Sequence, residues 1–225
     1  LGSGDITWID HIEKMASYDI PLFIATGAAT IEEVERAMSS ALKNTSKLVL
    51  MQCNTNYTAS LENFKYINLN VLRDYSKRFP TVLLGLSDHT PGHTTVLGAV
   101  TLGARAIEKH FTDDTSRDGP DHKFSMDPAT WREMVDRTRE LELALGDEKK
   151  RLMENEKQSY VVQRRSIHCI NSINKGEIIT EDNLIMLRPE PPESFQPYMI
   201  SDIIGKIALE DIPANTSILK KQIKV

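Results

Sequence analysis

The sequence predicts an α/β protein in which residues 1–146 form part of a (β/α)8 barrel and residues 164–225 form a small, mainly β domain. Three observations predict this. Short apolar runs alternate with helix-length segments through the first 145 residues, which indicates βα units and a parallel sheet. Their spacing of about 29 residues per unit matches an eight-unit barrel of about 250 residues. After a charged stretch, the pattern changes to short strands broken by turns.

Four apolar runs are predicted as parallel strands, each followed by a helix: Ile20–Thr26, Leu48–Cys53, Val82–Ser87 and Ala104–His110. If Leu1–Gly4 is the end of another strand, the chain holds five strand–helix units of the eight in a complete barrel. The abrupt start on Leu-Gly-Ser-Gly-Asp is typical of the interior of a fold, so we expect a fragment of a longer protein. An open five-stranded parallel sheet is the alternative.

The helix ends are marked by capping residues. Thr30 and Glu33 form the pattern of a capping box before a segment rich in helix formers. Asp127 is an expected N-cap with Pro128 at the first helical position, and Gly146 is the expected stop of that helix.

The composition changes after Gly146. Residues 147–163 are polar and rich in charge, which predicts a linker or an exposed connecting helix. Beyond them, strands are expected over Ser166–Ile170, Ile178–Thr180 and Leu184–Leu187. About 60 residues of this kind favour a compact β domain that is too small to bury much core by itself.

Bulk properties exclude several classes of protein. The 225 residues carry a formal net charge of -5 with dispersed basic residues, so nucleic acid is not an expected partner. No apolar run approaches the roughly 20 residues of a membrane-spanning helix, so no membrane contact is expected and the cytoplasm is the expected compartment. Cys53 and Cys169 fall in different predicted domains and are expected to be free thiols.

Two histidines stand at the ends of neighbouring predicted strands. His89 follows the strand that ends at Ser87, and Glu108 and His110 share one face of the next strand because side chains alternate. Two imidazoles placed in this way can ligate one metal ion, and their nitrogens suit Mn²⁺, Fe²⁺, Co²⁺ or Zn²⁺. Glu108 could orient a ligand, hold a water molecule or move a proton. In the alternative, His89 caps a helix and His110 is a hydrogen-bonded core residue.

Three further polar clusters lie at or after the ends of predicted strands. Gln52–Tyr57 ends a strand with hydrogen-bonding side chains and a ring, which suits a sugar or a phosphate. Thr26 is followed by Gly27, where backbone N–H groups can approach an anion. The loop Arg117–Lys123 is either a solvated loop or, because it lies at the same predicted end of the barrel, a substrate contact.

These motifs, in this order, resemble the N-acetylneuraminate (sialic acid) synthase family over nearly the whole chain. The resemblance rests on Gly85–Thr90, Glu108–Thr112 and Gly119–Asp121, together with Lys175–Thr180 and Leu187–Pro189 in the second domain. Members of that family consist of a TIM barrel and a C-terminal antifreeze-like (SAF) domain. They form domain-swapped homodimers in which the small domain covers the barrel of the partner subunit.

The resemblance implies a role for eight residues. His89 and His110 would be the metal ligands, most often for Mn²⁺, with Mg²⁺ or Co²⁺ as alternatives, and Glu108 would be a carboxylate of the catalytic centre. The remaining positions would contact substrates: Tyr57, Asp121 and, from the partner, Arg188 at the sugar, and Thr26 and Ser87 at phosphoenolpyruvate. Many relatives have Ser where this chain has Ala25, and Tyr-Pro-Thr-Pro where it has Tyr57 followed by Thr-Ala-Ser.

The implied activity is condensation of phosphoenolpyruvate with N-acetylmannosamine or a related amino-sugar aldehyde, which releases phosphate and forms a nonulosonic acid. A metal-dependent aldolase or a keto-sugar phosphate synthase on the same barrel is one alternative. A noncatalytic sugar-binding or assembly fragment, suggested by the three absent barrel units, is another.

Overall fold

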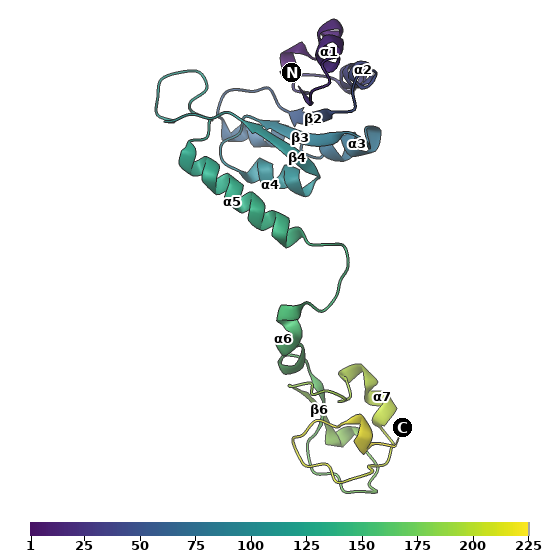
Figure 1. Cartoon of the computed structure of the whole chain (residues 1–225). Helices are drawn as coiled ribbons and strands as arrows, with labels where there is room; N and C mark the ends of the chain where they lie inside the picture. Colours follow the sequence, from purple (N-terminus) through teal and green to yellow (C-terminus); the bar gives the residue numbers. More distant parts are fainter. Residues whose placement is uncertain (225) are drawn as a thin grey trace. The chain divides into compact units, whose positions relative to one another are not determined.

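A computed structural model describes residues 1–224 of the chain. The chain divides into two compact units, with the boundary between Asp147 and Glu148. Both are drawn in Figure 1, and each is described by itself below.

The first unit is built on a four-stranded parallel sheet in which the strands follow one another in chain order, β1-β2-β3-β4. The order is that of consecutive βα units, so the predicted parallel α/β arrangement is confirmed. The strands are β1 (Leu22–Ala25), β2 (Leu48–Cys53), β3 (Leu83–Asp88) and β4 (Ala104–Lys109).

Helices connect the strands and follow the last of them. Thr30 and Glu33 form the predicted capping box at the start of α2, and Asp127 caps α5 with Pro128 at its first position. Gly146 ends α5 with a positive φ of 56°. The α-helices are α1 (Ile9–Ala16), α2 (Ile31–Leu42), α3 (Val71–Arg78), α4 (Thr94–Thr101) and α5 (Pro128–Leu145), and the 3-10 helices are η1 (Ser3–Asp5) and η2 (Leu61–Tyr66).

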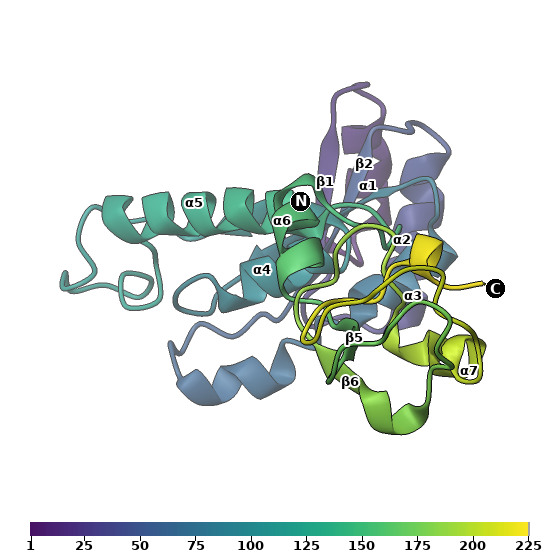
Figure 2. The same cartoon turned by 90° about the horizontal axis from the view of Figure 1, so that it is seen from below.

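The two faces of the sheet pack differently. Alternate residues such as Ile24, Leu50 and Leu86 enter a large core with α1, α2, α3 and α4. Intervening residues form a small cluster without helix residues: Ala25, Val49, Met51, Cys53 and Ala106. Helices therefore cover one face, as in a barrel wall. Figures 1 and 2 both show α5 running beside α4 on this side.

The first four residues correct one prediction. Leu1–Gly4 is not a strand, because the chain turns into η1 at Ser3. Only Leu1 keeps a sheet-like contact: its amino group donates to the carbonyl of Phe23 (2.7 Å), and its own carbonyl accepts from the N–H of Ala25 (3.1 Å). The described chain thus has four strands of this sheet, not five.

The second unit is small and irregular. Strands β5 (Ser166–Cys169) and β6 (Leu184–Leu187) pair antiparallel. Ile178–Thr180 was expected to be a strand, but it makes only an isolated bridge between Ile178 and Ile207. The helical segments are η3 (Glu154–Glu156), α6 (Lys157–Val162), η4 (Glu181–Asn183), η5 (Pro197–Met199), α7 (Ile200–Ile203) and η6 (Lys220–Gln222).

Isoleucines dominate the core of this second unit. Ile167, Ile179, Ile203 and Ile218 are all fully buried, and Phe195 packs among them. The unit therefore has a hydrophobic core of its own. Within residues 1–224, no helix has the length and hydropathy needed to cross a bilayer.

Candidate active site at the carboxyl ends of the strands

The ends of β3 and β4 bring together four of the predicted site residues. The register pairs Ser87 with Glu108, and the two imidazoles follow directly after these strands. The Ser87 hydroxyl donates to Oε1 of Glu108 at 2.8 Å. The ring centroids of His89 and His110 lie 5.1 Å apart. The predicted approach of the two rings is therefore present in the structure.

The hydrogen bond of His89 determines which nitrogen is free. Nδ1 of His89 lies 3.0 Å from the backbone carbonyl of Asn54. Because a carbonyl only accepts, Nδ1 is the nitrogen that donates in this contact, and in the neutral ring the lone pair lies on Nε2. This is the pattern of a metal-binding histidine whose other nitrogen is held by a carbonyl. Within the described residues, however, no group of three or more His, Cys, Asp or Glu is arranged to hold a metal ion.

The chemistry of the donors fits a cation held by two imidazoles, with further positions left to water or substrate. Asp121 adds a carboxylate nearby, since its Oδ2 lies 3.5 Å from Nδ1 of His110. The pKa of His110 lies below its ordinary value, because burial and the neighbouring His89 disfavour the imidazolium. Neutral imidazole is the form that ligates a metal.

Two aromatic rings enclose the imidazoles. The ring of Tyr57 lies 4.4 Å from that of His89, and the ring of Phe124 lies 5.0 Å from that of His110. Phe124 is buried, whereas Tyr57 is 49% exposed and can contact a ligand. The polar side chains of Asn56 and Asn63, joined at 3.1 Å, hold the loop that carries Tyr57.

The loop after β4 is closed at its base. The backbone of Met126 pairs with that of His110 and Thr112 through hydrogen bonds of 2.9 Å each. This pairing returns the chain to the strand end and places Asp121 and Phe124 beside the imidazoles. Phe124 lies one residue beyond the predicted loop Arg117–Lys123 and was missed, since a single phenylalanine gives no pattern.

Cys53 lies in the predicted polar run Gln52–Tyr57, but nothing beyond a free thiol was expected of it. Burial acts to raise the pKa of its thiol, but hydrogen bonds with His89, Ser3 and other neighbours outweigh burial and lower it. Burial likewise acts to lower the pKa of His89, and its hydrogen bond with Cys53 and the negative charge of the Cys53 thiolate outweigh burial and raise it.

The structure places Thr26 on the helix-covered side of the sheet. Its hydroxyl donates to the carbonyl of Met51 at 3.0 Å and accepts from Tyr75 at 3.1 Å. A contact between this hydroxyl and phosphoenolpyruvate requires it to leave one of these partners. Beside it, the N–H of Gly27 donates to the Ser3 hydroxyl at 3.1 Å.

Arg188 belongs to the second unit. It follows β6, is exposed, and its Nε donates to the carbonyl of Gln163. Its role at the sugar therefore stays a prediction.

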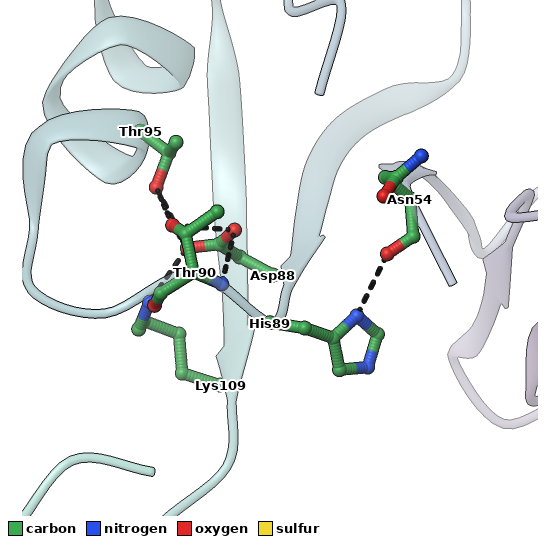
Figure 3. A network of polar contacts seen from close by, with 6 residues as sticks. All are labelled: Asn54, Asp88, His89, Thr90, Thr95 and Lys109. Atoms are coloured by element: carbon green, nitrogen blue, oxygen red, sulfur yellow. Dashed lines mark hydrogen bonds and ion pairs between the residues drawn. The ribbon is translucent and has the colours of Figure 1, made fainter. Parts of the chain in front are cut away.

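A buried ionic network beneath the imidazoles was also missed. Lys109 and Asp88 are each next in sequence to one of the histidines and form an ion pair with Nζ to Oδ2 of 2.6 Å (Figure 3). A charged residue at a strand end gives no local sign of burial. Only the register of β3 against β4 identifies its partner.

A parallel α/β unit with imidazoles and a carboxylate at its strand ends, followed by a small β unit, is the organisation of a family of sugar-acid synthases. The NeuB family model matches residues 1–150, and the SAF domain model matches residues 164–224. The chain belongs to the NeuB family.

Characterised relatives cover nearly the whole chain. It is 35% identical to the N,N'-diacetyllegionaminic acid synthases of Campylobacter jejuni and Legionella pneumophila, with 94% and 100% of the chain matched. It is 28% identical, over 98% of the chain, to human N-acetylneuraminate-9-phosphate synthase. The chain spans only 62% and 63% of the length of the two bacterial synthases.

Solved structures of related proteins also match the chain. The spore coat polysaccharide biosynthesis protein SpsE of Bacillus subtilis is 30% identical with a TM-score of 0.59, over 99% of this chain and 66% of that one. The N-acetylneuraminic acid synthetase of Leptospira borgpetersenii, in complex with citrate, is 29% identical with a TM-score of 0.62, over 70% of this chain and 54% of that one. The fold is therefore a partial TIM barrel followed by an antifreeze-like β domain.

Proposed function

We propose that the intact protein condenses phosphoenolpyruvate with an amino-sugar aldehyde to form a nonulosonic acid and phosphate. C3 of phosphoenolpyruvate forms the new bond to the aldehyde carbon, water adds at C2, and phosphate leaves with cleavage of the C–O bond. The observation that supports this most directly is the approach of His89 and His110 beside the Ser87–Glu108 hydrogen bond, at the carboxyl ends of adjacent strands.

His89 and His110 would hold a divalent cation, most often Mn²⁺ in this family. Bound there, the cation would supply Lewis-acid stabilisation of the negative charge that develops on the aldehyde oxygen of the sugar. The Asn54 carbonyl accepts from Nδ1 of His89, so that the neutral ring would offer Nε2 to the cation.

Glu108 is the proposed general base. Ser87 donates to Oε1 and so holds the carboxylate in one orientation, which leaves Oε2 for the water that adds at C2. Glu108 is exposed, so water can reach it. Tyr57 and Asp121 flank the imidazoles and are the proposed sugar contacts on this chain.

Membership of the NeuB family supports the roles proposed for three further residues, the metal and the oligomeric state. Thr26 and Ser87 would line the phosphoenolpyruvate site. Arg188 of a domain-swapped homodimer would reach the sugar from the partner subunit, and exclusion of water by that domain would strengthen the electrostatic contacts. We propose Mn²⁺ as the metal, the cytoplasm as the compartment, and residues 1–146 and 164–225 as the two domains joined by a linker.

The test is release of phosphate by the intact protein with Mn²⁺, phosphoenolpyruvate and N-acetylmannosamine or a diamino relative of it. We expect His89→Ala and His110→Ala to abolish release. His11→Ala is the matched control, because His11 stacks on Trp8 and not on the site. Full activity of both site variants would remove the metal assignment. Comparison of the acceptor sugars identifies which nonulosonic acid is formed.

A further inference from the structure

The last rung of the β3–β4 ladder carries a buried ion pair that the proposed mechanism does not use. Nζ of Lys109 lies 2.6 Å from Oδ2 of Asp88, and the two side chains are 1% and 0% exposed. Figure 3 shows both on the side of the strands away from the His89 ring.

Both charges are well supplied with hydrogen bonds. Lys109 also donates to the carbonyl of Thr90 at 2.6 Å. The carboxylate of Asp88 accepts from the hydroxyls of Thr90, at 3.0 and 2.9 Å, and of Thr95, at 2.6 Å. The network joins β3, the turn after it, the first turn of α4 and β4. It therefore ties four segments to one point.

Such a pair rarely adds net stability, because removing two charges from water costs about as much as their attraction returns. The best-attested use of buried polar groups is to select one arrangement among several. The pair joins β3 to β4, whose register shifts between Leu84 and Gly85. A slip of one residue would turn each side chain to the opposite face.

Because the pair lies directly before the two histidines, the register of β3 against β4 also affects the candidate site. Asp88 and Lys109 are the last paired residues of the ladder, and the next residue on each strand is a histidine. Beyond this rung β3 and β4 are no longer paired with each other, and the backbone of His110 pairs with Met126 instead.

We propose that Asp88 and Lys109 are positioning residues that hold His89 and His110 at the separation a shared divalent cation requires. The inference rests on the proposed metal-dependent function and deepens it. Neither residue touches the reacting atoms in this account; both act through the histidines that follow them.

The test removes both charges together, since removing one would leave the other buried without a partner. Asp88→Asn with Lys109→Met keeps the approximate shapes. The matched control is Arg132→Met with Asp136→Asn, which makes the same kind of change in an exposed ion pair of 2.6 Å on α5. Titration calorimetry with Mn²⁺, thermal melting without metal and the ¹⁵N spectrum of the imidazoles without metal are measured on the intact protein.

We expect the buried double variant to fold and to bind Mn²⁺ at least about tenfold more weakly, as when residues that orient metal ligands are changed. At a pH above the pKa of His89, the parent and the control give the spectrum of one neutral His89 tautomer with the proton on Nδ1. In the buried double variant, His89 gives a mixture. A folded double variant with unchanged Mn²⁺ affinity and a single tautomer would overturn the proposal.

A second variant, Thr95→Val, keeps the proposal testable if the double variant does not fold. Thr95→Val removes one hydrogen bond to Asp88 without leaving a charge unpaired, and we expect a smaller loss of Mn²⁺ affinity. If Thr95→Val is folded and binds Mn²⁺ as the parent does, the proposal is wrong. If the parent itself binds no Mn²⁺, the metal part of the proposed function fails, and the imidazole spectra alone decide whether the pair positions the histidines.

Discussion

The Ser87 hydroxyl donates a 2.8 Å hydrogen bond to Oε1 of Glu108, so a residue of β3 sets the orientation of a carboxylate on β4. The register that pairs these two residues also pairs Asp88 with Lys109 one step further along. The proposed base and the buried ion pair thus occupy neighbouring rungs of one ladder, on opposite faces of the sheet.

The first prediction concerns this carboxylate. Glu108→Gln should lower kcat by about 100-fold or more, because an amide cannot accept the proton of water. Ser87→Ala should lower kcat less, since the carboxylate remains and only its orientation is lost. Steady-state phosphate release measures both. Glu133→Gln, on the exposed side of α5, is the control and should be neutral. Equal activity of Glu108→Gln and the control would rule out general-base catalysis by Glu108.

The second prediction concerns Tyr57, whose ring lies 4.4 Å from that of His89. Tyr57→Ala should raise KM for the sugar more than it lowers kcat, because the ring is half exposed at the site and offers a contact surface. Tyr57→Phe keeps the ring and should retain most of the affinity. If both variants bind the sugar as the parent does, Tyr57 is not a sugar contact.

The third prediction concerns Gly27. A Cβ there would lie 1.9 Å from Oγ1 of Thr55, 2.9 Å from Sγ of Cys53 and 2.9 Å from Oγ of Ser3. These polar side chains would have to turn away, so Gly27→Ala should lower kcat/KM by about 10- to 100-fold through misplacement. Gly4→Ala is the control, because its Cβ would meet open space. Kinetics that are the same for both variants would contradict this account.

The fourth prediction concerns the core of the second unit. Ile167→Ala should cost about 2–5 kcal/mol of the free energy of unfolding, because the side chain is fully buried and leaves a cavity. Ile170→Ala is the control, since Ile170 is 40% exposed. Denaturant unfolding of the two variants gives the comparison. A similar loss in both would mean that the core is not where the burial of Ile167 places it.

Much of the fold was predictable because its evidence is local. The bounds of β2 and β6 agree with the apolar runs, and the caps at Thr30 and Asp127 are where the sequence indicates. The strand predictions over Leu1–Gly4 and Ile178–Thr180 were wrong for the same reason. A strand needs a partner, and the chain turns into η1 at Ser3 while Ile178 meets its partner at a single bridge.

The candidate site was predictable to the extent that strand alternation determines it. The shared face of Glu108 and His110, and the approach of His89, follow from period two and from parallel neighbours. Phe124 and the Asp88–Lys109 pair do not follow, since their contacts depend on the path of a loop and on the register between two strands. Neither has a signature within a window of sequence.

The isolation of Asp88 and Lys109 from solvent has a consequence for how the protein responds to its medium. Dissolved ions weaken attractions between exposed charges but reach buried ones far less. Raising the ionic strength should therefore loosen surface pairs such as Arg132–Asp136 while the Asp88–Lys109 contact stays as it is. The contact between the last paired residues of β3 and β4 should thus change little with the salinity around the protein.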